Sequence, residues 1–231
     1  ADCVKFQMRD IKSLYKNQGN HNDSSADLGE QYTLDLLSRF QLSNKELFKV
    51  FDYCKDKGKM PLCTPWDLES LYALEEYGMQ AYKVASADLT NLELLAAIAK
   101  TEKPMICSTG MSTEIEIKKA VDFLQNLNAQ YILLHCNSTY PTPYRDVNLR
   151  YLGKLSLINQ GGIVGYSGHE RGYLAATLAV ALGAKVVEKH FTIDKNREGN
   201  DHKVSLLPFE FKKMVEQIRL TEEMMGEDGE R

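Results

Sequence analysis

The sequence predicts an α/β fold of the (β/α)₈ TIM-barrel class, formed by one domain over residues 1–231. Three observations predict it. Apolar runs typical of strands alternate with helical patterns, nearly every run ends in a polar side chain, and 43% hydrophobic residues are enough for a substantial core. Strands that alternate with helices at this spacing imply βαβ units, and therefore a parallel sheet with helices outside it.

Seven short apolar runs predict the strands of this sheet. The first run is followed by a long polar segment, Asp10–Ser43, which is either a loop at the ligand-binding face or a partly mobile stretch. The predicted strands are Cys3–Gln7, Met60–Thr64, Ala81–Ser86, Pro104–Thr109, Tyr131–Cys136, Gly162–Ser167 and Ala184–His190.

Three stretches have clear helical patterns. Ser112–Leu127 places its apolar residues near one face, and Thr113 and Glu116 suit an N-terminal cap. Gly172–Leu182 is rich in alanine and leucine, which predicts a buried helix. Pro208–Met224 is amphipathic, which predicts a helix with one apolar face.

The polar ends of the strands favour a barrel over an open doubly wound sheet. A barrel collects the carboxyl ends of all its strands on one face, whereas an open sheet spreads them along an edge. These residues are Lys5, Gln7, Thr64, Lys83, Ser86, Ser108, His135, Ser167, His169, Glu188 and His190.

Composition excludes several classes of partner. The net charge of −4 argues against a nucleic-acid or anionic-membrane surface. No apolar run reaches the roughly 18 residues that a membrane span needs, and the first residues resemble neither a signal peptide nor a transit peptide. Five cysteines without CxxC spacing favour free thiols in a reducing cytoplasm over a disulfide framework.

Two histidines follow neighbouring strands, His169 and His190. Adjacent strands lie about 4.8 Å apart, so their side chains can reach one ion, and imidazole is a common ligand of divalent transition metals. Hydrogen-bonded polar residues that cap the barrel mouth are the alternative. His135 lies within an apolar strand, which favours a hydrogen-bonded core histidine.

Lys5 and Lys83 each lie between apolar strand residues. Burial of an unpaired ammonium is unfavourable, so both side chains should point into the barrel mouth, where they suit a phosphorylated or carboxylated ligand. A Schiff-base amine is one alternative, and a lysine that extends to solvent at a strand end is the other. Hydroxyl groups at other strand ends would complete an anion site: Thr64, Ser86, Ser108 and Ser167.

Three further polar residues each leave two interpretations open, and strand alternation places a fourth, Glu188. Asp88 is an acid/base or a helix cap, and Tyr140 packs on a sugar ring or within its own loop. Glu188 lies on the same side of its strand as His190 by alternation. Asp201 follows a glycine-containing turn and is a ligand contact or ordinary turn chemistry.

The motifs that carry these residues resemble the sialic acid synthase (N-acetylneuraminate synthase) family, with its legionaminate, pseudaminate and spore-coat relatives. In chain order they are KFQ, TPWDLES, AYKVAS, KPMICSTGMS, LLHCNSTYPTPYRDVNLR, GYSGHERG, ALGAKVVEKHFT and GNDHKVSL, within Asp2 to Arg219. The resemblance implies a barrel enzyme that condenses phosphoenolpyruvate with an N-acetylated aminohexose such as N-acetylmannosamine. The products would be a nine-carbon 2-keto sugar acid and phosphate.

The resemblance also implies roles for the matching positions. Lys5, Thr64, Lys83, Ser86, Ser108 and Ser167 would hold phosphoenolpyruvate, with Glu188 beside them. His169 and His190 would bind a divalent ion, Mn²⁺ or Mg²⁺. Gln7, Tyr140 and Asp201 would contact the sugar, and Asp88 would be the acid/base.

This chain departs from the family pattern in three ways. Gly168 stands where bacterial members commonly have aspartate, and Asp88 stands where many have glutamate. The chain starts at what should be the second barrel strand, so the family's first strand and its active-site carboxylate are expected to be missing. The C-terminal antifreeze-like domain, which in the family reaches into a partner's active site, is also expected to be missing, and a homodimer is implied for the full-length protein.

Two other functions remain open on the sequence. One is a Schiff-base barrel aldolase that uses Lys83, and the other is a non-enzymatic binding or assembly module. Borohydride trapping with pyruvate and phosphate release from phosphoenolpyruvate distinguish these from the synthase.

Overall fold

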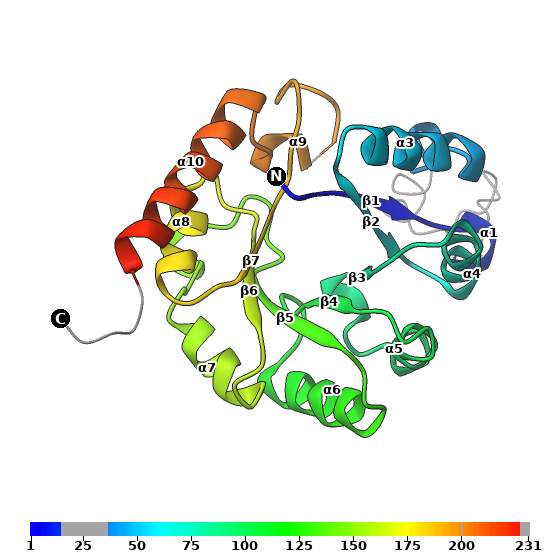
Figure 1. Ribbon diagram of the computed structural model, residues 1–231, viewed down its shortest axis with the longest axis horizontal. Coiled ribbons are helices and arrows are strands. Elements are labelled where there is room, and N and C mark those ends of the chain that lie inside the picture. The colour runs from blue at the N-terminus through cyan, green and yellow to red at the C-terminus, as the bar shows by residue number, and fades with distance from the viewer. Residues whose placement is uncertain (15–36, 200, 227–231) are drawn as a thin grey trace, which may run out of the picture.

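The computed structural model describes residues 1–14, 37–199 and 201–226, and a sheet of seven parallel strands lies at its centre (Figure 1). The strands lie side by side in chain order, each parallel to its neighbour. Such an order requires a crossover after every strand, which produces the curl of barrel folds. The strands are β1 Cys3–Met8, β2 Met60–Pro65, β3 Tyr82–Val84, β4 Met105–Ser108, β5 Tyr131–Cys136, β6 Val164–Gly168 and β7 Val186–Lys189.

Four of the strands, β3, β4, β6 and β7, are shorter than their apolar runs predict, and two of them have a clear local reason. β3 ends at Val84 because the chain turns into the 3₁₀ helix η1, Ser86–Asp88, directly after Ala85. β6 begins at Val164 because the preceding residues form a turn that the side chain of Asn159 holds through the carbonyl of Ile163. The β3 end is what brings Ser86 and Asp88 to the carboxyl edge of the sheet.

The helices lie around the outside of the curled sheet (Figure 1). Helices α8 and α10 pack against each other, and α8 also covers β6. The bounds are α1 Ile11–Leu14, α3 Asn44–Asp56, α4 Leu68–Tyr77, α5 Leu92–Ala99, α6 Glu114–Asn126, α7 Tyr151–Ile158, α8 Leu174–Ala181, α9 Asp201–Val204 and α10 Pro208–Met225, with a second 3₁₀ helix, η2, over Tyr144–Asp146.

Helix α6 begins as its sequence predicts. The side chain of Thr113 accepts from the backbone N–H of Glu116, and the carboxylate of Glu116 accepts from the N–H of Thr113. This capping box satisfies donors that the first turn of a helix otherwise leaves unpaired.

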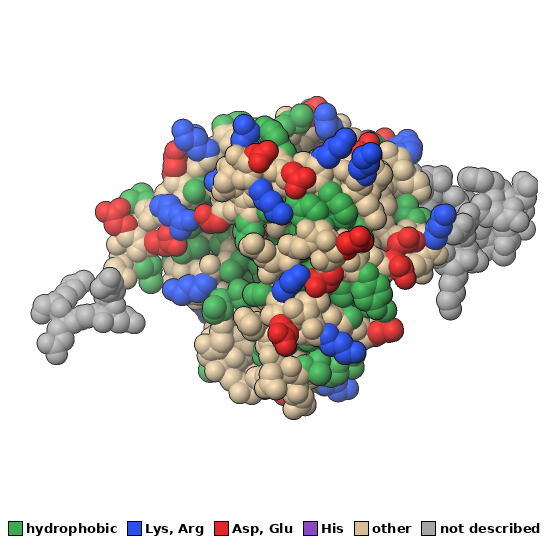
Figure 2. All heavy atoms as spheres, turned by 45° about the vertical axis from the view of Figure 1, so that its right-hand side comes forward, with side chains coloured by type: hydrophobic (Ala, Val, Ile, Leu, Met, Phe, Trp, Pro, Cys, Tyr) green, Lys and Arg blue, Asp and Glu red, His purple; other side chains and the backbone are tan. Residues whose placement is uncertain are grey.

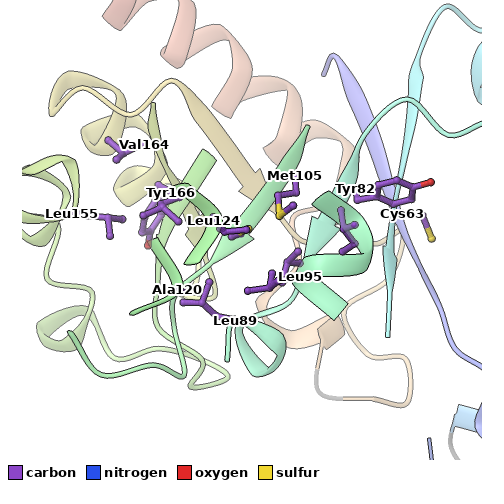
Figure 3. Close-up of a cluster of buried hydrophobic side chains, with 14 of the residues drawn as sticks. Cys63, Tyr82, Leu89, Leu95, Met105, Ala120, Leu124, Leu155, Val164 and Tyr166 are labelled. Carbon is purple, nitrogen blue, oxygen red and sulfur yellow. The ribbon is translucent and has the colours of Figure 1, made fainter. Parts of the chain in front are cut away.

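The hydrophobic core fills the layer between the sheet and the helices. Figure 3 shows Tyr82 and Met105 from the strands with Leu95 and Leu124 from α5 and α6 in this layer, and all four are fully buried. Apolar surface removed from water in this way is the main favourable contribution to folding.

The expectation of a buried helix over Gly172–Leu182 holds for one face of the helix only. Only the small residues of α8, Ala175, Ala176 and Ala179, are buried, whereas Leu174 is 66% and Leu178 47% exposed. The alanines let the helix lie close to β6 and α10, and the larger side chains then have to point outward.

The sheet has two edges, β1 and β7, and among the described residues no further strand pairs with either. One ion pair spans the space between them, with Lys5 Nζ 3.1 Å from Glu188 Oε1. The predicted barrel class is therefore confirmed in a coarser form, as a curled sheet of seven parallel strands with barrel-like order.

Positive and negative side chains are interspersed on the face of the molecule in Figure 2, in keeping with the small net charge. Within the part of the chain that the structure describes, no helix has the length and apolar character of a membrane span. His21 and most of the polar segment Asp10–Ser43 lie outside the described residues.

Candidate active site at the carboxyl ends of the strands

Because side chains alternate along a strand, the polar side chains of β1 point to the inner face of the sheet and the apolar ones point to the helices. In β1, Phe6 points outward and its ring lies 5.4 Å from that of Phe51 in α3, so Lys5 and Gln7 point to the inner face. Gln7 pairs with Thr64 in the neighbouring strand, which places both on that face. The inner face at the carboxyl ends of the strands is where the predicted residues collect.

Lys83 is the most deeply buried charged residue of this face, at 2% exposure. Its ammonium nitrogen donates to Ser108 Oγ and to the carbonyl of Val84, both at 2.7 Å. Burial lowers the pKa of Lys83, and the nearby charge of Glu188 opposes that effect. The side chain thus offers a third donor in a setting from which water is excluded.

Glu188 links the lysines to one another. Its Oε1 lies 3.1 Å from Lys5 Nζ and accepts a 3.4 Å hydrogen bond from Ser167 Oγ. Burial opposes its ionisation, but the positive charges of Lys83 and Lys5 outweigh burial and hold the pKa of Glu188 at about 2. At neutral pH this carboxylate is ionised and neutralises part of the positive charge.

A close backbone approach lies beside Ser86. The N–H of Gly110, at the turn after β4, donates to Ser86 Oγ at 3.1 Å. A Cβ on Gly110 would lie 2.7 Å from Ser138 Oγ and 2.9 Å from Cys136 Sγ, so only glycine fits without displacement. The turn therefore presents a backbone donor to the strand ends, as anion-binding turns do.

The second half of the site is built on His169. Its Nδ1 lies 2.6 Å from the carbonyl of Asn137, which can only accept, so Nδ1 carries the proton. Its Nε2 is therefore an acceptor, and the hydroxyl of Tyr140 donates to it at 2.8 Å. The two rings are stacked with centroids 4.0 Å apart. Burial lowers the pKa of His169 to about 4, so the imidazole is neutral at pH 7.

His190 lies beside this pair. Its ring centroid is 5.3 Å from that of His169 and 5.8 Å from that of Tyr140. Asp201, the first residue of α9, places Oδ2 3.8 Å from His190 Nδ1. Burial lowers the pKa of His190, and the charge of Asp201 partly offsets this.

This donor set fits a divalent cation. His169 is neutral and the Asn137 carbonyl orients its Nδ1, as a metal-ligating imidazole requires, and a bound ion would replace the Tyr140 hydroxyl at the lone pair of Nε2. No group of three or more histidine, cysteine, aspartate and glutamate side chains suited to a metal occurs among the described residues. Two imidazoles would leave the other coordination positions to water or ligand oxygens, as Mn²⁺ and Mg²⁺ accept.

Three of the predicted residues lie near this centre without a direct contact to it. Thr64 is buried at 1% exposure. Gln7 accepts from Arg9 at 2.7 Å and from Trp66 at 3.0 Å through one oxygen. Asp88 accepts only from Asn91 at 3.3 Å, and its buried Oδ2 meets no hydrogen-bond donor among the described residues. Asn91, not Asp88, caps α5.

Two residues of the site were not predicted. Cys136 Sγ lies 3.7 Å from both Ser86 Oγ and His169 Nδ1, and the carbonyl of Asn137 sets the His169 tautomer. Alternation along β5 could have indicated Cys136, since His135 points away from the site and its Nε2 donates to the carbonyl of Val147 at 2.7 Å. That buried position confirms His135 as a core histidine.

The arrangement of the strand ends agrees with a comparison against known families. Residues 1–230 match the NeuB family. The chain belongs to the NeuB family. The resemblance to sialic acid synthases that its motifs indicate is confirmed at the level of the family, and the match covers both halves of the site.

Curated relatives of this NeuB-family chain include synthases of several nonulosonic acids. It is 45% identical to an uncharacterised protein of Methanocaldococcus jannaschii, over 98% of this chain and 64% of that one. It is 38% identical to the N,N'-diacetyllegionaminic acid synthase of Campylobacter jejuni (98% and 69%) and 32% to human N-acetylneuraminate-9-phosphate synthase (98% and 63%). The chain thus spans about two thirds of their length.

Solved structures give the same result for the fold. The N-acetylneuraminic acid synthetase of Leptospira borgpetersenii superposes with a TM-score of 0.89 at 29% identity, over 100% of this chain and 76% of that one. A truncated 3-deoxy-D-arabino-heptulosonate 7-phosphate synthase from Thermotoga maritima, at 18% identity, has a TM-score of 0.69 over 80% of this chain and 74% of that one, which shows a shared fold.

Proposed function

We propose that this NeuB-family chain carries the active site of a phosphoenolpyruvate-dependent synthase. The reaction condenses phosphoenolpyruvate with an N-acetylated aminohexose, N-acetylmannosamine or a related sugar, to a nine-carbon 2-keto sugar acid and phosphate. One observation carries the proposal: two lysines and a histidine–tyrosine pair lie at the carboxyl ends of the same sheet. Lys83 is hydrogen-bonded to Ser108, and Lys5 forms an ion pair with Glu188. Tyr140 is hydrogen-bonded to His169. Relatives named as nonulosonic acid synthases support it.

The lysine half would bind the doubly charged phosphoenolpyruvate. Lys83 and Lys5 would donate charge-assisted hydrogen bonds to its phosphate and carboxylate, which are about twice as strong as neutral ones. Low exposure of Lys83 increases this effect, because field strength rises where water is excluded. Hydroxyl donors would complete the contacts: Thr64, Ser86, Ser108 and Ser167.

The bond changes follow from what these residues hold in place. Carbon 3 of phosphoenolpyruvate attacks the aldehyde carbon of the open-chain sugar and forms the new C–C bond. Water then adds at carbon 2, and phosphate leaves with cleavage of its C–O bond. Asp88 would exchange the required proton, since burial raises its pKa and favours the acid form.

The histidine half would hold the sugar. Gln7, Tyr140 and Asp201 would contact its hydroxyl groups. His169 and His190 would hold Mn²⁺ or Mg²⁺, whose chemistry when bound is Lewis-acid polarisation of a carbonyl oxygen. The Tyr140 ring stacks on the His169 ring and would keep it oriented.

Three further parts of the proposal concern the whole protein. Residues 1–231 form one barrel domain, and the full-length protein is a homodimer. The four buried free thiols support a reducing compartment, the cytoplasm.

A phosphate-release assay tests the function. Phosphoenolpyruvate, Mn²⁺ and a panel of N-acetylated aminohexoses are supplied, and free phosphate and 2-keto acid are measured together. The expected result is equal release of both with one acceptor, and loss of release in His190→Ala with an unchanged circular dichroism spectrum. No release with any acceptor would contradict the proposal and favour an assembly module.

The lowered pKa of Lys83 keeps a Schiff-base aldolase as the second candidate, since such enzymes need a neutral amine. Borohydride reduction in the presence of pyruvate, followed by mass spectrometry, decides between the two. The synthase stays unlabelled, whereas an aldolase gains one covalent adduct on Lys83.

A further inference from the structure

A second charged pair lies behind the histidines, and the proposed reaction does not use it. Lys189 Nζ is 2.9 Å from Glu170 Oε1, and the two side chains are 0% and 1% exposed. Tyr166 donates to the other oxygen, Glu170 Oε2, at 2.7 Å. These three residues form a Tyr166–Glu170–Lys189 cluster with no access to solvent.

The cluster lies on the outer face of the sheet, next to the histidines along the chain. Glu170 directly follows His169, and His190 directly follows Lys189. Gly168 pairs with Lys189 in the register of β6 and β7. The ion pair therefore connects the turn after β6 to the last residue of β7. Each partner of the ion pair is adjacent in the sequence to one of the two histidines.

Gly168 makes this arrangement possible. A Cβ at Gly168 would lie 2.5 Å from Glu170 Oε2 and 2.7 Å from Tyr166 Cε1. A side chain at this position would displace the carboxylate from its place between Tyr166 and Lys189. The glycine at position 168 thus leaves room for the Glu170 carboxylate.

Stability alone does not account for the cluster. Replacement of a buried ion pair by apolar residues of similar volume is often neutral or stabilising, because both charges lose their hydration. Here Glu170 Oε1 has the ion pair but no hydrogen bond among the described residues, so its hydration is replaced incompletely. Such a pair does, however, fix the position of the two joined backbone segments relative to each other.

We propose that the Tyr166–Glu170–Lys189 cluster is a positioning device that fixes the separation and orientation of His169 and His190. The inference rests on the proposed role of these histidines as a cation site. Groups that hydrogen-bond to a metal ligand commonly change metal affinity by about 10- to 100-fold, and the cluster acts one step further away, through the backbone. A loss of about tenfold in Mn²⁺ affinity is therefore expected when it is removed.

The test replaces the cluster by apolar residues, Tyr166→Phe with Glu170→Leu and Lys189→Met. Thermal unfolding reports on the fold. Calorimetric titration of the metal-free protein with Mn²⁺ reports on the site, and long-range ¹H–¹⁵N spectra report the tautomers of His169 and His190. The expected result is a folded protein with about tenfold weaker Mn²⁺ binding and a mixed His169 tautomer.

The chain provides a matched control at the other end of the strands. Tyr82, Glu75 and Lys103 form a cluster of the same residue types, in which Glu75 Oε1 accepts from both Tyr82 Oη and Lys103 Nζ and the side chains of Lys103 and Glu75 are 27% and 31% exposed. Tyr82→Phe with Glu75→Leu and Lys103→Met removes this cluster by the same three substitutions. This variant should keep the Mn²⁺ affinity and the histidine spectra of the wild type.

Wild-type Mn²⁺ affinity and an unchanged His169 tautomer in the apolar variant would overturn the proposal. If that variant is recovered unfolded, Glu170→Gln, which keeps the volume and removes the charge, is judged by the same two measurements. Failure of the proposed function gives a different result: the wild type then releases no phosphate, or His190→Ala binds Mn²⁺ normally. In that case the tautomer spectra alone decide whether the cluster orients the histidines.

Discussion

The ammonium of Lys83 is held by Ser108 Oγ and the carbonyl of Val84 in a place that solvent does not reach. An ion so placed is costly for the folded state, yet it is ready for a second negative partner without loss of side-chain entropy. The same burial that lowers its pKa is what makes it an effective anion donor.

Lys83→Met should therefore separate binding from stability. Loss of a charge-assisted hydrogen bond costs about 1.5–3 kcal/mol, so affinity for phosphoenolpyruvate should fall about 10- to 150-fold. The melting temperature should stay the same or rise, because a buried charge has been removed. Calorimetric titration measures the first effect, and exposed Lys100→Met is the control. Unchanged affinity in Lys83→Met would remove Lys83 from the binding site.

Asp88 predicts a pH effect on stability. Burial raises the pKa of this carboxyl, so the folded state binds a proton more tightly than the unfolded state does. The stability that Asp88 contributes is present at low pH and is lost as pH rises through the folded pKa. Asp88→Asn should thus gain melting temperature relative to wild type as pH increases from about 4 to 7. An equal difference at both pH values would contradict a raised pKa.

Alternation along strands was sufficient to predict the inward lysines, since neither Lys5 nor Lys83 could point into an apolar layer. It could not reveal Asn137, because a backbone carbonyl has no signature in the sequence. Nor could it reveal the Glu170–Lys189 pair, whose two partners lie in different units of the fold and meet only when β6 and β7 pair.

At the scale of elements, the inner face of β6 is limited by its neighbours. A Cβ on Gly165 would lie 2.4 Å from the carbonyl oxygen of Val186 and 2.6 Å from Leu134 Cδ2. The strand can lie between β5 and β7 at this point only because the residue has no side chain.

Gly165→Ala should destabilise the protein by about 1–3 kcal/mol, as overpacking of a well-filled interior does. Gly153→Ala is the opposite case, since Gly153 lies in α7 with nothing within 4 Å of an added Cβ. That variant should gain about 0.5–1 kcal/mol from helix propensity. Urea unfolding of both variants gives the comparison, and a stable Gly165→Ala protein would show that β6 can shift.

Helix positions were predictable from periodicity and caps, as α6 and α10 show. The exposed leucines of α8 were not. An alanine- and leucine-rich stretch has no polar face from which its orientation could be read, so the packing of α8 against β6 and α10 determined which residues became buried.

At the scale of the molecule, the alternation of strands and helices predicted the parallel order of the sheet. The distance between the two edges of the sheet could not be predicted, because it depends on the accumulated twist of all the strands. Exposed strand edges are templates for pairing with another chain.

The protein should therefore self-associate as its concentration rises, and sedimentation velocity measures this association directly. Val4→Lys, at a position of β1 that is 37% exposed, should weaken the association, since a charged lysine disfavours strand addition. Tyr72→Lys, an exposed residue of α4, is the control. Equal association of both variants would locate the contact elsewhere.

The Lys5–Glu188 contact joins the two edge strands through the same ammonium that faces the inner surface. A negatively charged ligand must compete with Glu188 for the ammonium of Lys5. Ligand binding therefore weakens the ion pair that joins β1 to β7. We expect an anionic ligand to bind most readily when the Lys5–Glu188 ion pair is broken, and the ion pair to form again when the ligand dissociates.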